Sequence, residues 1–143
     1  MAVFEFVSLT CITPSELDGD EVYILFNGIK VFPGPEQRFR SFKAGTKIVN
    51  TEAGMSDMDL ESLRGGSDTT ALADMVGADS LRRVGIPEVG LLLKVMDFDS
   101  VTSDDLLGSV LVSDLSASGL QERRLTGDGG EYVLTFLVQP GIS

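Results

Sequence analysis

Apolar and polar residues alternate along most of this chain in short runs, the period of a β-strand that faces a core on one side. The clearest runs span residues 3–12, 22–26, 91–96, 106–112 and 132–138. In the last run, apolar residues occupy both sets of alternating positions, with Thr135 as the exception. We therefore expect the closing strand to lie buried between neighbouring strands.

Turn signals join several of these runs. Asn27-Gly28 separates residues 24–26 from residues 29–32, and this dipeptide supplies the positive φ angles of a tight two-residue hairpin. Residues 39–43 and 46–49 flank Ala44-Gly45 and predict a second short hairpin. These patterns favour an antiparallel β-sheet protein.

Residues 50–88 depart from the alternation. Residues 56–64 and 68–76 each have a capping residue, early acids, leucines at helical spacing and a glycine stop, so they predict two short helices. Asp57, Asp59 and Glu61 are interpreted as acids facing a helix dipole rather than as metal ligands. We predict one domain over residues 1–143, an antiparallel β-sandwich with a small helical insertion at about residues 50–88 that covers a sheet edge or meets a partner.

An acidic loop follows the strand-like run at residues 91–96. Asp97 and Asp99 leave the same side of an extended chain, and Asp104 and Asp105 return on the far side of the loop. Clustered carboxylates without nearby His or Cys favour calcium over zinc or copper. A helix-loop-helix calcium site would need Gly and Glu where Thr102 and Gly108 stand, so the loop is instead expected to join two strands.

Residues 96–108 resemble the third calcium-binding loop of the C2 domain, the β-sandwich module of protein kinase C and the synaptotagmins. Asp97-Phe98-Asp99, Asp105 and Leu106-Leu107-Gly108 match that family's loop in register. The resemblance implies an eight-stranded type of sandwich with Greek key topology. It also implies one group of calcium ligands in this loop: the carboxylates of Asp97, Asp99 and Asp105, the Thr102 hydroxyl and the Phe98 carbonyl. Asp104 falls outside this ligand set, and Val101 corresponds to a loop tip that dips into lipid.

The resemblance covers roughly residues 3–49 and 89–138. Asp20-Glu21-Val22-Tyr23 is similar to the family's Ser-Asp-Pro-Tyr, which implies Asp20 or Glu21 as a further calcium ligand. The family's pair of first-loop aspartates and its Asn-Pro-x-Trp signature have no counterpart. In that family a basic cluster contacts lipid headgroups, and the resemblance gives this role to a stretch that otherwise reads as solvated charges on an edge strand: Lys30, Arg38, Arg40, Lys43 and Lys47.

Charge narrows the function further. The 11 basic and 22 acidic residues give a net charge of −11, which disfavours nucleic acid and repels anionic membrane unless bound calcium reverses the sign locally. The chain has no His, and its single Cys11 lies in an alternating apolar run, so we expect a buried structural thiol and a binding module rather than an enzyme.

Three functions remain open from the sequence. The first is calcium-dependent binding to anionic phospholipid. The second is a calcium-stabilised domain that binds a protein or carbohydrate and ignores membranes, and the third is the same sandwich without a metal. The amino-terminal residues lack the basic and apolar regions of a secretory signal, so we expect a cytoplasmic or peripheral membrane protein.

Overall fold

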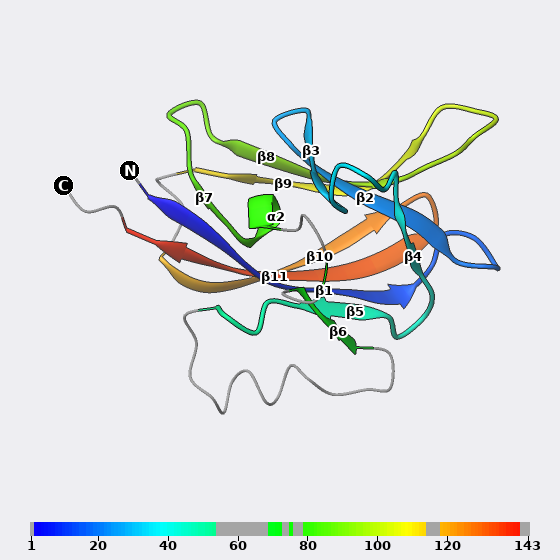
Figure 1. The fold of residues 1–143 in the computed structure, drawn as a ribbon, viewed down its shortest axis with the longest axis horizontal. Helices are drawn as coiled ribbons and strands as arrows, with labels where there is room; N and C mark the ends of the chain where they lie inside the picture. The colour runs from blue at the N-terminus through cyan, green and yellow to red at the C-terminus, as the bar shows by residue number, and fades with distance from the viewer. Residues whose placement is uncertain (1, 54–68, 73–74, 76–78, 114–117, 141–143) are drawn as a thin grey trace.

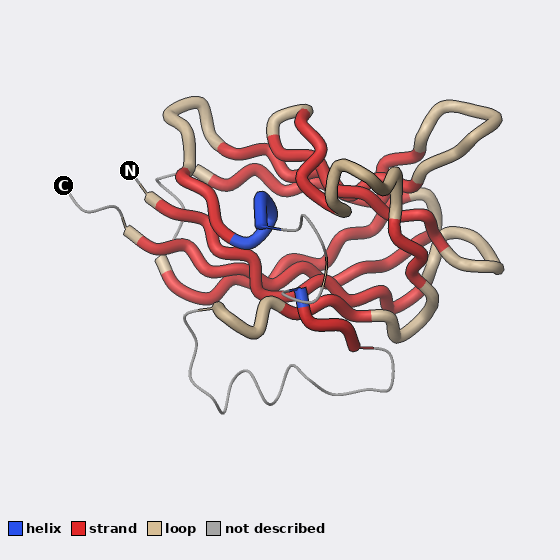
Figure 2. Tube along the Cα trace, viewed as in Figure 1, coloured by secondary structure: helices blue, strands red, loops and turns tan. Residues whose placement is uncertain are grey.

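Two β-sheets pack face to face in a computed structural model that describes residues 2–53, 69–72, 75, 79–113 and 118–140 (Figure 1). The strands are β1 (Val3–Thr13), β2 (Asp20–Phe26), β3 (Ile29–Phe32), β4 (Arg40–Phe42), β5 (Lys47–Val49), β6 (Thr69–Ala71), β7 (Arg83–Gly85), β8 (Leu91–Asp97), β9 (Asp105–Val112), β10 (Gly119–Gly127) and β11 (Gly130–Gln139). The short helix α2 (Asp79–Arg82) precedes β7. The predicted β-sandwich is confirmed, and strands and loops dominate its trace (Figure 2).

Sheet A contains both the first and the last strand of the fold. Its order is β10-β11-β1-β5-β6, and β7 also pairs with β1. β11 lies between β10 and β1, as its apolar residues on both faces predict. All pairings in this sheet are antiparallel except β5 with β6, which is parallel.

Sheet B forms the upper layer in Figure 1 and has the order β3-β2-β8-β9, with β4 also paired to β2. Every pairing in it is antiparallel. β2 and β8 each alternate buried and half-buried positions, so one side of each strand faces the core and the other faces away from sheet A.

The core fills the space between the two sheets with aromatic and aliphatic side chains. Phe4 of β1 stacks on Phe136 of β11 at 5.3 Å between ring centroids and meets the edge of Phe26 from sheet B at 5.4 Å. Such contacts add stability beyond the burial of their area. Cys11 is free and buried, as predicted, and burial raises the pKa of its thiol.

The hairpin expected around Asn27-Gly28 is confirmed. Phe26 pairs with Ile29, and Asn27 and Gly28 have φ angles of 49° and 85°. The second expected hairpin is wrong, because β4 pairs with β2 in sheet B whereas β5 pairs with β1 in sheet A. The Ala44-Gly45 turn therefore carries the chain from one sheet to the other.

The middle segment also departs from expectation. The helix predicted over residues 56–64 lies outside the described residues. The helix predicted over residues 68–76 is wrong for Thr69–Ala71, which form β6 against the edge of β5. Pairing with an open sheet edge outweighs the weak local helical signal, and two adjacent threonines suit a strand. No helix of the described residues is long and apolar enough to cross a membrane.

Candidate functional site

The predicted calcium-binding residues gather at one end of the sandwich. Three connections meet there: the loop at residues 14–19 between β1 and β2, the loop at residues 98–104 between β8 and β9, and the turn at residues 128–129 between β10 and β11. The first two project from the same end of the molecule (Figure 1). Sheet register places the carboxylates here, because Asp97 ends β8 and lies opposite both Val22 of β2 and Asp105 of β9.

Asp97 is a buried carboxylate, 2% exposed. Its Oδ1 accepts a 2.8 Å hydrogen bond from the Glu21 amide, and its Oδ2 lies 3.4 Å from the Ser15 hydroxyl. Burial raises the pKa of Asp97 to about 6, the Glu21 amide opposes that shift, and the nearby charge of Asp20 adds to it. The ionised form of Asp97 is therefore destabilised by burial at neutral pH. Either protonation or a bound cation would remove this energetic cost.

Asp20 is equally buried but fully engaged. Its two oxygens accept hydrogen bonds from the Ser15 amide at 3.0 and 2.9 Å, the Ser15 hydroxyl at 2.7 Å, the Glu16 amide at 3.2 Å and the Tyr132 hydroxyl at 2.6 Å. A hydroxyl has one hydrogen, so Ser15 donates it to Asp20 at the shorter distance rather than to Asp97. Asp20 thus orders the loop between β1 and β2 and ties it to β11.

Asp99 closes a local turn in the loop between β8 and β9. Its Oδ1 accepts hydrogen bonds from the amides of Val101 at 2.8 Å and Thr102 at 3.1 Å, and its Oδ2 accepts one from the Thr102 hydroxyl at 2.7 Å. These bonds, with the Val101 amide first, lower the pKa of Asp99 and keep it ionised. Asp99 and Thr102, both predicted to be calcium ligands, are hydrogen-bonded to each other.

Asp104 and Asp105 have different surroundings. Asp104 accepts hydrogen bonds from the Asp99 amide at 2.9 Å and from the Tyr23 hydroxyl, so it braces the loop. The pKa of Asp105 is raised, chiefly by the charge of Asp128 in the turn between β10 and β11. The pair of Asp105 and Asp128 places two carboxyl groups side by side at the rim of this end.

The remaining expected ligands lie nearby. The Phe98 amide donates a 2.7 Å hydrogen bond to the Glu21 carbonyl, which joins the start of the loop to β2. The Phe98 ring stacks on Phe39 at 5.4 Å between centroids, and the Arg38 guanidinium lies 5.9 Å from its centroid. This aromatic and cationic stack covers one flank of the loop.

The donor chemistry suits calcium, since all the side chains concerned offer hard oxygen atoms. The arrangement is less favourable. Within the described residues, no three His, Cys, Asp or Glu side chains lie close enough together to hold a metal ion. Asp20 and Asp99 already accept several protein hydrogen bonds each. These carboxylates have the chemistry of a calcium site without forming a preassembled one.

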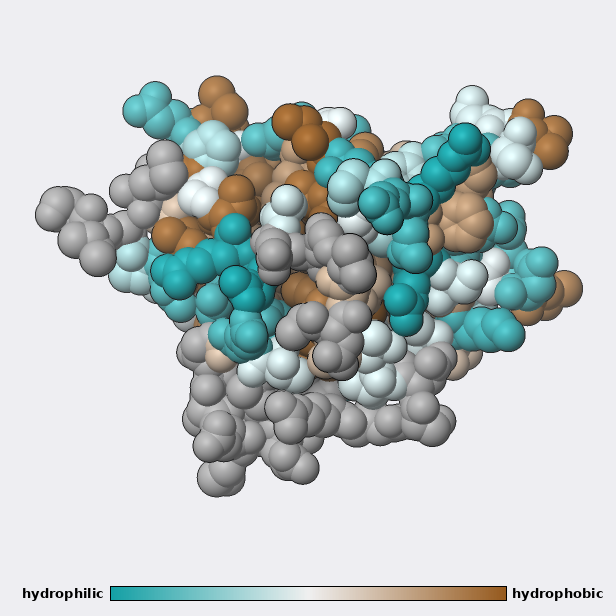
Figure 3. Space-filling view, in the orientation of Figure 1, coloured by the Kyte–Doolittle hydropathy of each residue, from teal (hydrophilic) through white to brown (hydrophobic). Residues whose placement is uncertain are grey.

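Two exposed apolar side chains mark this end. Leu17 is fully exposed in the loop between β1 and β2, and Val101 is 89% exposed in the loop between β8 and β9. Apolar groups form the outermost points of both projecting loops in the space-filling view (Figure 3). Two loops thus present apolar groups beyond the carboxylates.

The predicted basic patch is spread over both sheets. Lys30 lies on β3 and Arg40 on β4 of sheet B, whereas Lys47 lies on β5 of sheet A; Arg38 and Lys43 lie in connections. The Lys30 ammonium donates hydrogen bonds to the carbonyls of Gly34 and Gln37 in the β3–β4 connection. These contacts give Lys30 a structural role. The Arg40 guanidinium donates a 3.5 Å hydrogen bond to the Thr70 hydroxyl of β6.

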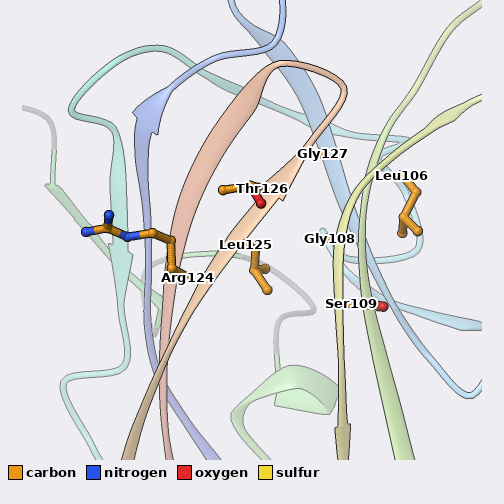
Figure 4. A pocket seen from close by; sticks show the side chains of 7 residues that line it. All are labelled: Leu106, Gly108, Ser109, Arg124, Leu125, Thr126 and Gly127. Atoms are coloured by element: carbon orange, nitrogen blue, oxygen red, sulfur yellow. The ribbon is translucent and has the colours of Figure 1, made fainter.

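A hollow of about 330 Å³ lies between the adjacent edges of β9 and β10 (Figure 4). Its lining includes Gly108, Ser109 and Leu125, and the Arg124 side chain points away from β9. Arg124 instead pairs with Glu131 at 3.1 Å. The hollow therefore lacks convergent charged groups and is not a candidate site.

Several residues of this end escape sequence reasoning. Ser15 and Tyr132 donate hydrogen bonds to the buried Asp20, Asp128 faces Asp105, and Leu17 supplies a second apolar tip. The apolar pattern of β11 is consistent with a buried Tyr132. The hydrogen-bond acceptor of its hydroxyl, Asp20, depends on how sheet B packs on sheet A. Leu17 stands between acidic residues in a short loop, and this isolated apolar position is the only signal of an exposed tip.

When the chain is compared with known proteins, only solved structures give matches. No family model matches the chain, and no curated protein matches it in sequence. The chain is similar to a structure described as a C2 domain (12% identity, 96% of each chain covered, TM-score 0.40). It is also similar to a C2 domain of plant extended synaptotagmin 1 (10% identity, 99% of this chain and 95% of that one, TM-score 0.38).

A third similar structure is human GIVD cytosolic phospholipase A2 (14% identity, TM-score 0.38). The match covers 98% of this chain, which spans 17% of the phospholipase chain.

Proposed function

We propose that this domain is a non-enzymatic module that attaches to phospholipid surfaces through the end that carries Leu17 and Val101. The observation that most directly supports this proposal is the exposure of these two side chains on loops that project from the same end. Apolar side chains at such positions are stabilised when they enter the boundary between headgroups and acyl chains. Two insertion points from separate loops would also fix the orientation of the domain on the surface.

Calcium is the cation proposed for this end. The acidic surroundings of both tips, with Glu16, Asp18 and Asp99 close by in sequence, would repel anionic headgroups. Asp97, Asp99 and Asp105 would hold the ion, with the Thr102 hydroxyl, the Phe98 carbonyl and Asp20 or Glu21, and its charge would offset that repulsion. The raised pKa of Asp97 supports this proposal, because a buried carboxylate that favours a proton also gains from a neighbouring cation.

One observation favours a second candidate, an interaction domain without a metal that binds a protein or carbohydrate. Asp20 accepts bonds from Ser15, Glu16 and Tyr132, and Asp99 accepts bonds from its own loop. Carboxylates satisfied in this way can serve as structural acceptors that shape the loops. In this candidate, Leu17 and Val101 contact a partner rather than lipid.

Vesicle sedimentation separates the two candidates. The protein is mixed with phosphatidylcholine vesicles that contain or lack phosphatidylserine, in low salt, with calcium, magnesium or a chelator. The first candidate predicts sedimentation with anionic vesicles in calcium and not in chelator. Absence of binding to every vesicle in saturating calcium would exclude the lipid proposal and leave an interaction domain, with or without a bound metal.

A further inference from the structure

Sheet B presents an apolar surface on the side that faces away from sheet A. In β2 and β8, the residues between the buried ones point outward because side chains alternate along a strand, and register places Leu106, Ser109 and Leu111 of β9 beside them. Strand register aligns Tyr23 with Met96 and Leu106, and Leu92 with Leu111. We call this set the outer face of sheet B: Tyr23, Leu25, Leu92, Lys94, Met96, Leu106, Ser109 and Leu111.

This composition is unusual for the outer side of an antiparallel sheet, which is normally polar. Within this set only Lys94, Ser109 and the hydroxyl of Tyr23, which donates to Asp104, are polar, and the charged residues Glu21 of β2 and Lys30 of β3 border it. Leu106 and Leu111, on the edge strand, are 45% and 65% exposed. In Figure 1, the described strands of sheet A and α2 all lie below sheet B. Contiguous apolar surface of this kind marks an interaction site.

Lys94 lies in the middle of the outer face. It aligns with Leu25 on one side and Ser109 on the other, with Leu92 and Met96 above and below it on β8. The Lys94 ammonium forms neither a salt bridge nor a hydrogen bond with any other residue that the structure describes. A partner covering this face must therefore bring a carboxylate to that position, because an unpaired ammonium buried in an interface is costly.

The position of Lys94 also indicates which kind of partner can cover this face. A second copy of the chain would bring two unpaired lysines together between bodies that each carry a net charge of −11. On a lipid surface, cations are favoured at the rim near headgroups, whereas Lys94 would be pressed inward with the surrounding apolar side chains. A protein element can instead hold one carboxylate at a fixed point within an apolar surface.

We propose that the outer face of sheet B docks a partner protein through an amphipathic element, with an apolar stripe that carries one acidic residue opposite Lys94. A helix laid across three strands meets this requirement, since packing an apolar helix stripe on a sheet is a standard two-layer arrangement. The docking face begins at the loop end, where Tyr23 bonds Asp104, and extends along sheet B to Leu92 and Leu111 at the opposite end of the strands.

The test uses two synthetic amphipathic helical peptides of about 18 residues, or five turns. Both have the same leucine stripe, with Glu at its centre in one peptide and Lys in the other. Binding to the isotope-labelled full chain is followed by amide chemical shifts. We expect the Glu peptide to shift resonances of β2, β8 and β9 and to bind at least tenfold tighter than the Lys peptide.

Charge reversal supplies the decisive variant. Lys94→Glu should reverse the order of the two affinities, and Leu111→Asp should weaken the Glu peptide at least tenfold. Arg83→Glu, the same change of charge at an exposed position of β7 in sheet A, should leave both affinities unchanged. Thermal melts establish that all three variants fold. Equal affinities for the two peptides, no shifts at millimolar peptide, or shifts confined to the loops would overturn the proposal. Protection of this face by phosphatidylcholine and phosphatidylserine vesicles, without peptide binding, would assign it to lipid instead.

Discussion

The Tyr132 hydroxyl donates a 2.6 Å hydrogen bond to Asp20, which joins the last strand of sheet A to the first strand of sheet B. Both residues are buried, at 0% and 1% exposure. Burial and the bond to Asp20 raise the pKa of Tyr132, so its hydroxyl stays protonated and remains a donor. Through Asp20, this bond also holds the loop that carries Leu17.

Tyr132→Phe removes the donor and leaves the Asp20 carboxylate buried with one bond fewer. Loss of a buried hydrogen bond to a charged acceptor should lower the free energy of unfolding by about 1–3 kcal/mol. Urea unfolding measures this change. Tyr23→Phe, which removes the hydroxyl bonded to Asp104 on the more accessible side of sheet B, is the matched control and should cost less. An unchanged stability of Tyr132→Phe would show that Asp20 does not depend on Tyr132.

Asp97 predicts a pH dependence of stability. Its pKa is about 6 in the folded protein, above the 3.8 of an unperturbed Asp side chain, so the folded state binds more protons between these values. The stabilisation from this group is fully present below pH 4 and is lost as pH rises through 6. Without calcium, Asp97→Asn should therefore be more stable than wild type at pH 7, by roughly 1–3 kcal/mol.

The pH series itself provides the check on Asp97. Asn can still accept from the Glu21 amide through its oxygen and can donate toward the Ser15 hydroxyl, so it mimics the protonated acid. The gap between variant and wild type should shrink as the pH falls from 7 to 4. A variant that is less stable than wild type at pH 7 would show that the charge of Asp97 is structural.

The elements that the sequence predicts correctly are those set by neighbouring residues. Alternation locates β1, β2, β8, β9 and β11, and Asn27-Gly28 locates the β2–β3 turn. The errors come from contacts distant in sequence. Thr69–Ala71 is a strand because β5 offers it an edge, and β4 and β5 separate because their partners, β2 and β1, lie in different sheets.

The candidate site was likewise predicted only in part. Its spacing places Asp97, Asp99 and Asp105 at one loop, but the buried carboxylates are oriented by donors elsewhere. The Glu21 amide of β2 bonds Asp97, and Asp20 accepts from Ser15 in another loop and from Tyr132 in the other sheet. Because hydrogen bonds compete with a cation for the same oxygen atoms, residue spacing alone does not establish whether the carboxylates converge.

Gly108 is expected to tolerate no side chain. A Cβ at this position would lie 2.5 Å from the Leu125 Cβ, where β9 and β10 approach each other. Gly108→Ala should force the two strands apart and destabilise the fold by about 1–3 kcal/mol. Gly119→Ala is the control, with open space around its Cβ but a φ of 101°, so its cost reflects backbone strain alone. Thermal denaturation of both variants separates close packing from strain, and an unperturbed Gly108→Ala would contradict the close approach.

Calcium should raise the melting temperature if the carboxylates of the loop end hold it. A ligand bound only to the native state adds about 2.7 kcal/mol at a hundredfold excess over its Kd. Asp99→Asn removes a charge while keeping the turn acceptor, and should weaken calcium binding by tenfold or more, about 1.4 kcal/mol. Glu88→Gln, an exposed change between β7 and β8, is the control. A melting curve that calcium leaves unchanged in wild type would remove the metal from the proposal.

Leu17 and Val101 provide the most direct test of lipid attachment. Leu17→Asp and Val101→Asp should each abolish sedimentation with anionic vesicles in calcium, because a charged tip resists entry into the headgroup boundary. Val101→Trp should tighten binding, since an indole ring favours that boundary. Both side chains are exposed, so these variants should stay within about 0.5 kcal/mol of wild-type stability.

Val89→Asp supplies the matched control, because Val89 is 88% exposed between β7 and β8. If Val89→Asp weakens binding as much as Val101→Asp, attachment depends on overall charge rather than on the two loop tips.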